Sequence, residues 1–327
     1  MMRPERAGLL VALMFASLMG CGDQSSASPT FAIATGGPAG LYYPFGGGMA
    51  SIWSEHLPHV NVKAEVTGGS VTNVIQVARQ ESELGIAMAD VVSNAYLGEG
   101  RFPEALPLRV LLNAYPNIVH ILTLDDSGIT SVRELAGRRV SLGAAGSGTA
   151  VAALNVLGAL GVAEQDISAA YLSFSETTSA LKDGTIDAGF VVGGLGLAAV
   201  TELSVTRDLH LVALNDDEVA AINAAHNAYS GYLIPSGTYN GIDEPVLALG
   251  IWSAVVVHED MPARLAYQMV CTLFAHRQAL LKVSPVARDL TVSNMDALKA
   301  VPLHPGSRRY IKHVAEERPT DCVAGYE

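Results

Sequence analysis

Residues 139–160 read RVSLGAAGSGTAVAALNVLGAL, and this stretch decides between a membrane span and a unit of strand, loop and helix. Residues 140–163 carry no charged side chain, and this run is long enough to cross a bilayer, since a spanning helix needs ~20 apolar residues. Glycines interrupt the run repeatedly, together with Ser, Thr and Asn. The pattern therefore predicts a short strand at 139–142, a glycine loop, and a helix that ends near Leu160.

The composition agrees with buried parallel strands better than with a membrane protein. Hydrophobic residues make up 50% of the 327 residues and charged residues only 16%. Parallel strands are covered on both faces, so they appear as continuous apolar runs. Domains of ~100–200 residues are typical, and the length therefore favours about two domains.

Similar strand and helix signals alternate in two consecutive series. Thr35-Gly36-Gly37 follows a strand at 31–35 and opens a Gly-rich loop over 38–48, and Gly68-Gly69-Ser70 precedes a helix at 71–79. The second series begins near Thr130 and contains the 139–160 stretch. Strands interleaved with helices predict an α/β fold with parallel sheets. We therefore expect two α/β lobes.

Two apolar strands, 119–124 and 249–257, are expected to connect the lobes, and a helix is expected over 261–281. This assigns residues 30–121 and 252–320 to lobe I, residues 122–251 to lobe II, and 321–327 to a C-terminal tail. A ligand would lie in a cleft between the lobes, where loops at strand ends face each other.

The three glycine loops are suited to binding an anion. A helix N-terminus leaves ~4 backbone N–H groups unpaired and carries a partial charge of about +0.5. Glycine lets a ligand approach that backbone, and Ser or Thr adds a hydroxyl. Any one loop could equally be a plain turn with a capping hydroxyl, but three loops in two lobes favour a site.

Motifs for nucleotide binding and catalysis are missing. Gly146 and Gly148 are followed neither by Lys-Ser/Thr nor by the third glycine of a dinucleotide fingerprint, and Ser147 lacks the flanking glycines of a nucleophile elbow. No cluster of Cys and His has metal-ligand spacing. The net charge is −12, with no basic stripe, which argues against nucleic acid. We expect no catalytic residue, no metal and no cofactor.

The N-terminus has the order of a secretory signal. Arg3 and Arg6 precede an apolar run at 7–20, and Gly20 stands directly before Cys21. This resembles a bacterial lipobox, which would make residues 1–20 a lipoprotein signal peptide and Cys21 the lipidated first residue. Residues 21–29 would form a flexible tether. An ordinary signal peptide or a short anchor helix remains the alternative.

Three other features have more than one interpretation. Cys271 and Cys322 could form a disulfide, which is permitted outside the cytoplasm, or remain one buried and one exposed thiol. Asp90 ends a buried strand and could serve a site or cap the next helix. Tyr42 could cover a ligand or anchor its loop.

The motifs together resemble the TAXI family of TRAP-transporter solute receptors over nearly the whole chain after residue 30. The resemblance rests on these segments: Thr35-Gly36-Gly37-x-x-Gly40-x-Tyr42-Tyr43-Pro44-x-Gly46-Gly47, Thr67-Gly68-Gly69-Ser70-x-x-Asn73 with the later Asp90, Gly146-Ser147-Gly148-Thr149, Tyr171-x-Ser173-Phe174-x-Glu176, Asp183-Gly184-Thr185-Ile186-Asp187-Ala188, Ile234-Pro235-x-Gly237-Thr238-Tyr239-x-Gly241, and Pro302-x-His304-Pro305-Gly306-x-x-Arg309-Tyr310.

The resemblance implies a two-lobe fold like that of the type II periplasmic binding proteins, with a hinge and an interlobe cleft. It implies a periplasmic, lipid-anchored and monomeric receptor that delivers a small anionic solute, such as glutamate or a dicarboxylate, to a TRAP permease in the membrane. By match, the ligand contacts would be the following residues: Thr35, Gly36, Tyr42, Ser70, Asn73 and Asp90 from one lobe, and Ser147, Gly148 and Thr149 from the other.

One departure from the family pattern concerns the ligand. The family often has Gly-x-Pro after the strand that ends at Val192, where this chain has Gly193-Gly194-Leu195-Gly196. The motifs also contain no Arg near the predicted contacts, so we expect backbone N–H groups and hydroxyls to hold the anion. Two other roles compete: a ligand sensor for a membrane signalling protein, and an α/β enzyme.

Overall fold

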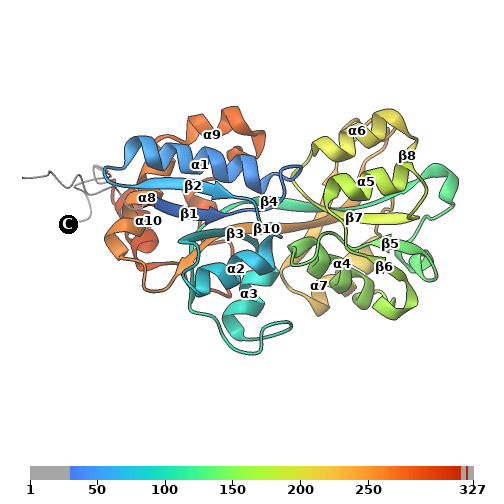
Figure 1. Ribbon diagram of the computed structural model, residues 1–327, viewed down its shortest axis with the longest axis horizontal. Coiled ribbons are helices and arrows are strands. Elements are labelled where there is room, and N and C mark those ends of the chain that lie inside the picture. The colour runs from blue at the N-terminus through green and yellow to red at the C-terminus, as the bar shows by residue number, and fades with distance from the viewer. Residues whose placement is uncertain (1–29, 318–321, 323–327) are drawn as a thin grey trace, which may run out of the picture.

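The computed structural model describes residues 30–317 and residue 322. It has two lobes side by side, and one mixed sheet passes through both (Figure 1). The predicted signal peptide, the tether with Cys21, and most of the predicted tail lie outside the described residues. No helix in the described ranges combines the length and apolar character that crossing a bilayer requires.

The strands have the following bounds: β1 (Thr30–Ala34), β2 (Asn61–Glu65), β3 (Leu84–Met88), β4 (Leu108–Leu124), β5 (Arg139–Ser141), β6 (Ser168–Ala170), β7 (Ala188–Gly193), β8 (Leu209–Leu211), β9 (Tyr229–Ile234) and β10 (Val246–His258).

The α-helices have the following bounds: α1 (Tyr42–His56), α2 (Ser70–Ala78), α3 (Ala89–Leu97), α4 (Gly148–Ala159), α5 (Phe174–Lys182), α6 (Ala198–Thr206), α7 (Asp216–Ala225), α8 (Ala263–Ala275), α9 (Arg277–Val283) and α10 (Pro305–Ala315). Short 3-10 turns occur at Asp125–Ser127, Val132–Leu135, Glu164–Asp166, Pro285–Arg288 and Val292–Asn294.

The strand order shows that each lobe repeats one arrangement. The sheet runs β2-β1-β3-β10-β4-β7-β5-β6, with β8 paired to β4 and β9 paired to β10. In lobe I, β1 lies between β2 and β3 in parallel, and in lobe II β5 lies between β6 and β7 in the same way. Each set of three parallel strands is bordered by an antiparallel strand: β10 pairs with β3 in lobe I, and β4 pairs with β7 in lobe II. The prediction of an α/β fold with two lobes is confirmed.

Two long antiparallel strands, β4 and β10, join the lobes. β4 pairs with β10 from Leu108 onward and with β7 over 118–122, and β10 pairs with β3 over 253–257. The pairing of β4 with β10 shifts register between Trp252 and Ala254. Both strands therefore change partners near the middle of the molecule, as a two-strand connection requires. The exact lobe boundaries at 121/122 and 251/252 stay a prediction.

Apolar residues of each lobe pack beneath its helices. In lobe I, α1, α8 and α9 cover one face of the sheet, where Trp53, Tyr115 and Tyr267 are fully buried. A second cluster extends from α2 and α3 across β4 and β10 to α4, so it spans both lobes. A third lies between the lobe II strands and α6. The disulfide is present: Cys271, on α8, bonds to Cys322.

Several predicted element bounds are wrong. Tyr42 to Gly48 belong to α1 rather than to a loop. Glycine usually weakens helices, but Gly46 packs against β1, where an added Cβ would lie 2.5 Å from Cγ2 of Thr35. Strand β4 begins at Leu108, well before the predicted strand at 119–124, and the helix predicted over 261–281 breaks at His276.

Candidate ligand-binding cleft

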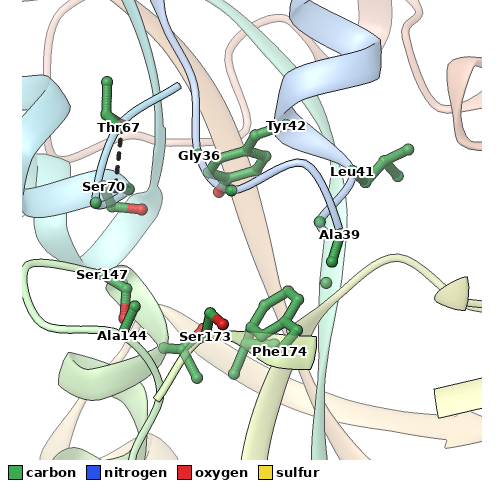
Figure 2. A pocket seen from close by; sticks show the side chains of 18 of the residues that line it. Gly36, Ala39, Leu41, Tyr42, Thr67, Ser70, Ala144, Ser147, Ser173 and Phe174 are labelled. Atoms are coloured by element: carbon green, nitrogen blue, oxygen red, sulfur yellow. Dashed lines mark hydrogen bonds between the residues drawn. The ribbon is translucent and has the colours of Figure 1, made fainter. Parts of the chain in front are cut away.

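A cavity of about 380 Å³ lies between the lobes at the strand ends. The loop before α1 and the starts of α2, α4 and α5 meet there (Figure 2). The lining residues are Gly36, Gly37, Pro38, Ala39, Gly40, Leu41, Tyr42, Thr67, Gly68, Gly69, Ser70, Met88, Asn117, Ala144, Ser147, Gly148, Thr149, Ser173, Phe174, Ser175, Val192 and Gly193.

Tyr42, the first residue of α1, is held by the strands that join the lobes. Its hydroxyl lies 3.1 Å from the Ser253 hydroxyl on β10 and accepts a hydrogen bond of 3.2 Å from Asn117 on β4. Asn117 also donates to Ser253 at 2.5 Å. Burial raises the pKa of Tyr42 to about 12, so the phenol stays neutral. The ring thus forms a fixed, uncharged wall of the cleft.

The start of α2 places Ser70 at the cleft and touches lobe II directly. Ser70 is 1% exposed, its oxygen accepts the N–H of Met88 at 3.1 Å, and its hydroxyl also interacts with the Tyr42 hydroxyl. The N–H groups of Val71 and Thr72 donate to the Gly146 carbonyl at 3.1 and 3.3 Å. A loop of lobe II therefore satisfies part of the α2 N-terminus, and the lobes are in contact.

Lobe II supplies two capped helix starts. Ser147 caps α4 by accepting the N–H of Ala150 at 3.1 Å, and Ser173 caps α5 in a capping box with Glu176. The caps leave the N–H groups of Gly148 and Thr149 on α4, and of Phe174 and Ser175 on α5, with no hydrogen-bond partner within residues 30–317. All four residues line the cavity. Such first-turn donors are the backbone groups that bind anions.

The lobes approach each other closely at Gly148. A Cβ there would lie 2.6 Å from the Ser70 oxygen and 2.7 Å from the Met88 sulfur, both in lobe I. Real Cβ atoms do not come that close, so Ser70 and Met88 would have to shift to admit a side chain at this position. The missing side chain of Gly148 therefore lets the two lobes come together, and it also lets a ligand approach the backbone of the lobe II loop.

None of the lining residues carries a charged side chain. Leu41, Met88, Val192, the Tyr42 ring and the Phe174 ring provide apolar surface, and Ser70, Ser147 and Ser173 provide hydroxyls. In Figure 2, Tyr42 and Gly36 of lobe I lie opposite Phe174 and Ser173 of lobe II. The positive potential in the cleft therefore comes from helix N-termini rather than from Lys or Arg.

Six of the nine predicted contacts line the cavity: Gly36, Tyr42, Ser70, Ser147, Gly148 and Thr149. Thr35, Asn73 and Asp90 lie behind it. The Thr35 hydroxyl donates to the Glu65 carbonyl, and the Asn73 amide donates to the Thr35 and Ile86 carbonyls. Both side chains are fully buried and hold the ends of β1 and β3 beside α2. Their hydrogen bonds shape the cleft wall from behind.

Asp90 joins the two lobes at a second place. It lies in the first turn of α3, is 5% exposed, and accepts the Tyr229 hydroxyl at 2.6 Å and the Asn155 amide at 3.3 Å. Tyr229 is on β9 and Asn155 on α4, both in lobe II. Burial raises the pKa of Asp90 to about 6, although these hydrogen bonds lower it. Asp90 is thus a cross-lobe contact outside the cavity lining.

Several lining residues were not among the predicted contacts. Phe174 and Ser173 occur in a quoted motif, and the spacing from Ser173 to Glu176 is a capping-box signal that could have located a helix start at the cleft. Asn117 gives no comparable signal, because it lies inside β4 and reaches the cleft only through the pairing of β4 with β10. Within the described residues, no group of three or more His, Cys, Asp or Glu could hold a metal ion.

These features define a two-lobe α/β protein of the periplasmic-binding-protein fold, with its cleft between the lobes. The chain belongs to the NMT1-like family, whose model matches residues 33–314.

Solved structures with a similar fold have low sequence identity. A protein from Bordetella bronchiseptica RB50 has a TM-score of 0.51 at 13% identity, with 88% of this chain and 98% of that one covered. A Xanthomonas citri protein bound to ATP has a TM-score of 0.50 at 12% identity, over 88% and 96% of the two chains. The aliphatic sulphonate-binding protein of Escherichia coli has a TM-score of 0.47 at 13% identity, over 89% and 80%. Similarity at this level concerns the fold.

Proposed function

We propose that this protein is an extracytoplasmic receptor of the TAXI type, which captures a small anionic solute and delivers it to a TRAP permease. One observation carries the proposal: the interlobe cavity receives the free first-turn N–H groups of α4 and α5 and the hydroxyl of Ser70. Backbone donors at helix N-termini bind oxyanions without a cationic side chain. Four of the seven segments of the TAXI resemblance contribute lining residues, namely those that begin at Thr35, Thr67, Gly146 and Tyr171.

The mechanism in this proposal is capture by closure. A ligand that contacts both lobes stabilises the closed form, because β4 and β10 allow the lobes to rotate about their middle segments. The contacts of Gly146 with α2 and of Asp90 with Tyr229 and Asn155 would form in that state. The permease would then recognise the closed, loaded receptor. No chemical step is part of this role.

Thermal unfolding with a panel of small organic acids tests binding. A ligand at 100 times its Kd adds ~2.7 kcal/mol to the free energy of unfolding. We expect at least one acid to raise the melting temperature, with an affinity confirmed by calorimetry. Failure of every acid in the panel would contradict the proposal.

Transport in reconstituted vesicles tests the TRAP assignment. Vesicles that hold a TRAP permease should take up the labelled acid only when this receptor is present, and uptake should stop when an ionophore dissipates the ion gradient. Uptake that persists without a gradient and requires ATP would contradict the TRAP assignment while leaving solute binding intact.

A further inference from the structure

The two sides of the cleft differ in chemistry. Lobe II presents four free backbone N–H groups at the starts of α4 and α5. Lobe I presents the side chain of Leu41, the sulfur of Met88 and the ring of Tyr42, and its Ser70 hydroxyl lies beside Gly148 at the start of α4. Of the α2 donors, Val71 and Thr72 are already bonded to Gly146. One end of a ligand thus meets hydrogen-bond donors, while the rest meets apolar surface.

The cavity has no partner for a positive charge. The two carboxylates beside the lining elements are engaged elsewhere. Asp90 accepts hydrogen bonds from Val91, Tyr229 and Asn155, and Glu176 accepts them from the backbone and hydroxyl of Ser173. Neither carboxylate lines the cavity. An ammonium group buried without a counter-charge is strongly disfavoured, so an amino acid would lose its hydration without compensation.

A second negative charge also lacks a partner. A dicarboxylate that placed one head on α4 and α5 would bring the other toward Leu41, Met88 and Tyr42. No Arg, Lys or His lines the cavity there, and the polar side chains Thr67 and Asn117 already donate to other protein groups. Desolvation of a carboxylate against apolar side chains is unfavourable for the same physical reason. The Phe174 ring adds to the apolar surface and packs against Gly40 of lobe I. A Cβ added at Gly40 would lie 3.4 Å from Cε2 of this ring.

From this asymmetry we infer that the ligand is a singly charged organic acid, with one oxyanion head on α4 and α5 and an uncharged apolar body against lobe I. The inference rests on the proposed function, because it names the solute class of the same cleft. It departs from the amino acid and dicarboxylate ligands that the sequence resemblance implies. The head group is a carboxylate or a sulfonate, which share the chemistry that the N–H groups recognise.

Calorimetric titration with acids of matched size tests the inference. The probes are 4-methylpentanoate, 3-methylbutane-1-sulfonate, leucine and glutarate, where leucine adds only an ammonium to the first acid and glutarate is a dicarboxylate of similar length without the branched end. We expect the better of the two monoacids to bind at least about 100-fold more tightly than leucine or glutarate, a difference of ~2.7 kcal/mol. Comparison of the two monoacids assigns the head group.

The outcomes separate the inference from the proposed function. Tighter binding of leucine or glutarate would overturn the inference and leave an anion receptor in place. Binding of no acid would overturn both. A preference for either monoacid supports both.

A pair of variants at Phe174 tests the assigned position of the head. Phe174 is the first residue of α5 and follows an extended Ser173, a position where proline fits a helix and removes only the N–H. Phe174→Ala and Phe174→Pro both remove the ring, but only the second removes the donor. We expect Phe174→Pro to bind the preferred monoacid about 10-fold more weakly than Phe174→Ala, as loss of one charge-assisted hydrogen bond predicts. Equal affinities of the two variants would overturn the placement of the head on α5.

Discussion

At the residue scale, the most consequential position is Gly148, because it combines an unpaired backbone N–H at the cavity with a contact between the lobes. Its N–H is free at the start of α4, and its missing Cβ admits Ser70 and Met88 of lobe I. Both requirements concern the backbone. The Gly and Ser pattern identifies the loop in the sequence. The atoms that contact Gly148 belong to the other lobe, so they could not be predicted from that pattern.

Replacement of Gly148 by alanine should therefore weaken ligand binding by hindering closure. We expect Gly148→Ala to raise the Kd at least about 10-fold, with ~1.4 kcal/mol or more lost from binding. The lobes themselves should remain folded, because the clash lies between them. Calorimetry and circular dichroism measure the two effects.

Gly158→Ala is the matched control in the same helix. A Cβ at Gly158 would meet nothing within 4 Å. Alanine there should leave affinity unchanged and add about 0.5–1 kcal/mol of stability. If Gly148→Ala binds as tightly as this control, the close approach does not govern closure.

Asp90 illustrates a residue whose position the sequence indicated but whose partners it did not. The carboxylate follows β3, where sites cluster in α/β folds. The structure directs it to Tyr229 and Asn155 instead, because α3 turns this face toward lobe II. Those partners lie far along the chain, so no local motif reports them.

The raised pKa of Asp90 predicts a specific pH dependence. The pKa is about 6 in the folded protein and 3.8 in the ordinary case, so between these values the folded state binds the extra proton. The free energy of unfolding therefore falls as pH rises through this range, by about 2–3 kcal/mol from this group. Buried His120 has its pKa lowered to about 4 and contributes the opposite slope.

Asp90→Asn should remove the first slope and keep the second. We expect the variant to gain stability relative to the wild type as pH rises from ~4 to ~6, and the difference to stay constant above pH 7. Urea unfolding across this pH range measures it. Parallel pH profiles for the two proteins would show that Asp90 does not titrate in this way.

At the element scale, the strand-to-helix turns were the predictable part of the site. The loops before α2 and α4 carry Gly with Ser, and each proves to end at the cavity. The start of α1 was misjudged because two of its glycines pack against other elements rather than forming a turn: Gly46 against Thr35 at the end of β1, and Gly48 against Leu280 and Val283 of α9. The predicted strand at 119–124 covers only the second part of β4, because Pro116 and Asn117 interrupt the apolar pattern, while pairing with β10 keeps the strand continuous.

The disulfide between α8 and Cys322 anchors the chain beyond α10. Because the bridge closes a loop of 51 residues, its removal should cost about 2–4 kcal/mol of stability. Cys322→Ser leaves the buried Cys271 in place and tests this by urea unfolding. Ligand affinity should not change, because neither cysteine lines the cavity. Equal stability of variant and wild type would contradict a stabilising bridge.

At the scale of the whole molecule, the two-lobe plan followed from alternating strand and helix signals, and the crossing strands β4 and β10 followed from their apolar runs. The spatial repetition of strand order between lobes could not be foreseen, because the two lobes share no evident sequence repeat. The ligand charge class depends on which side chains are absent from the lining, and only the assembled cleft reveals that.

Membrane attachment belongs to the same scale, and Cys21 lies outside the described residues. If Cys21 is lipidated, as we propose, cells that express the full chain should incorporate a labelled fatty acid and retain the protein in the membrane fraction. Cys21→Ala should lose the label, whereas Cys322→Ser should keep it. Label retained by Cys21→Ala would contradict lipidation at this residue.

A crystal structure of the protein with its preferred acid would locate the bound anion directly. We expect one oxyanion head within hydrogen-bond distance of the N–H groups of Gly148, Thr149, Phe174 and Ser175, about 2.7–3.2 Å. We also expect an apolar body against Tyr42 and Leu41, with the lobes closed. An acid clamped by an arginine side chain, or bound away from the interlobe cleft, would contradict this placement of the anion.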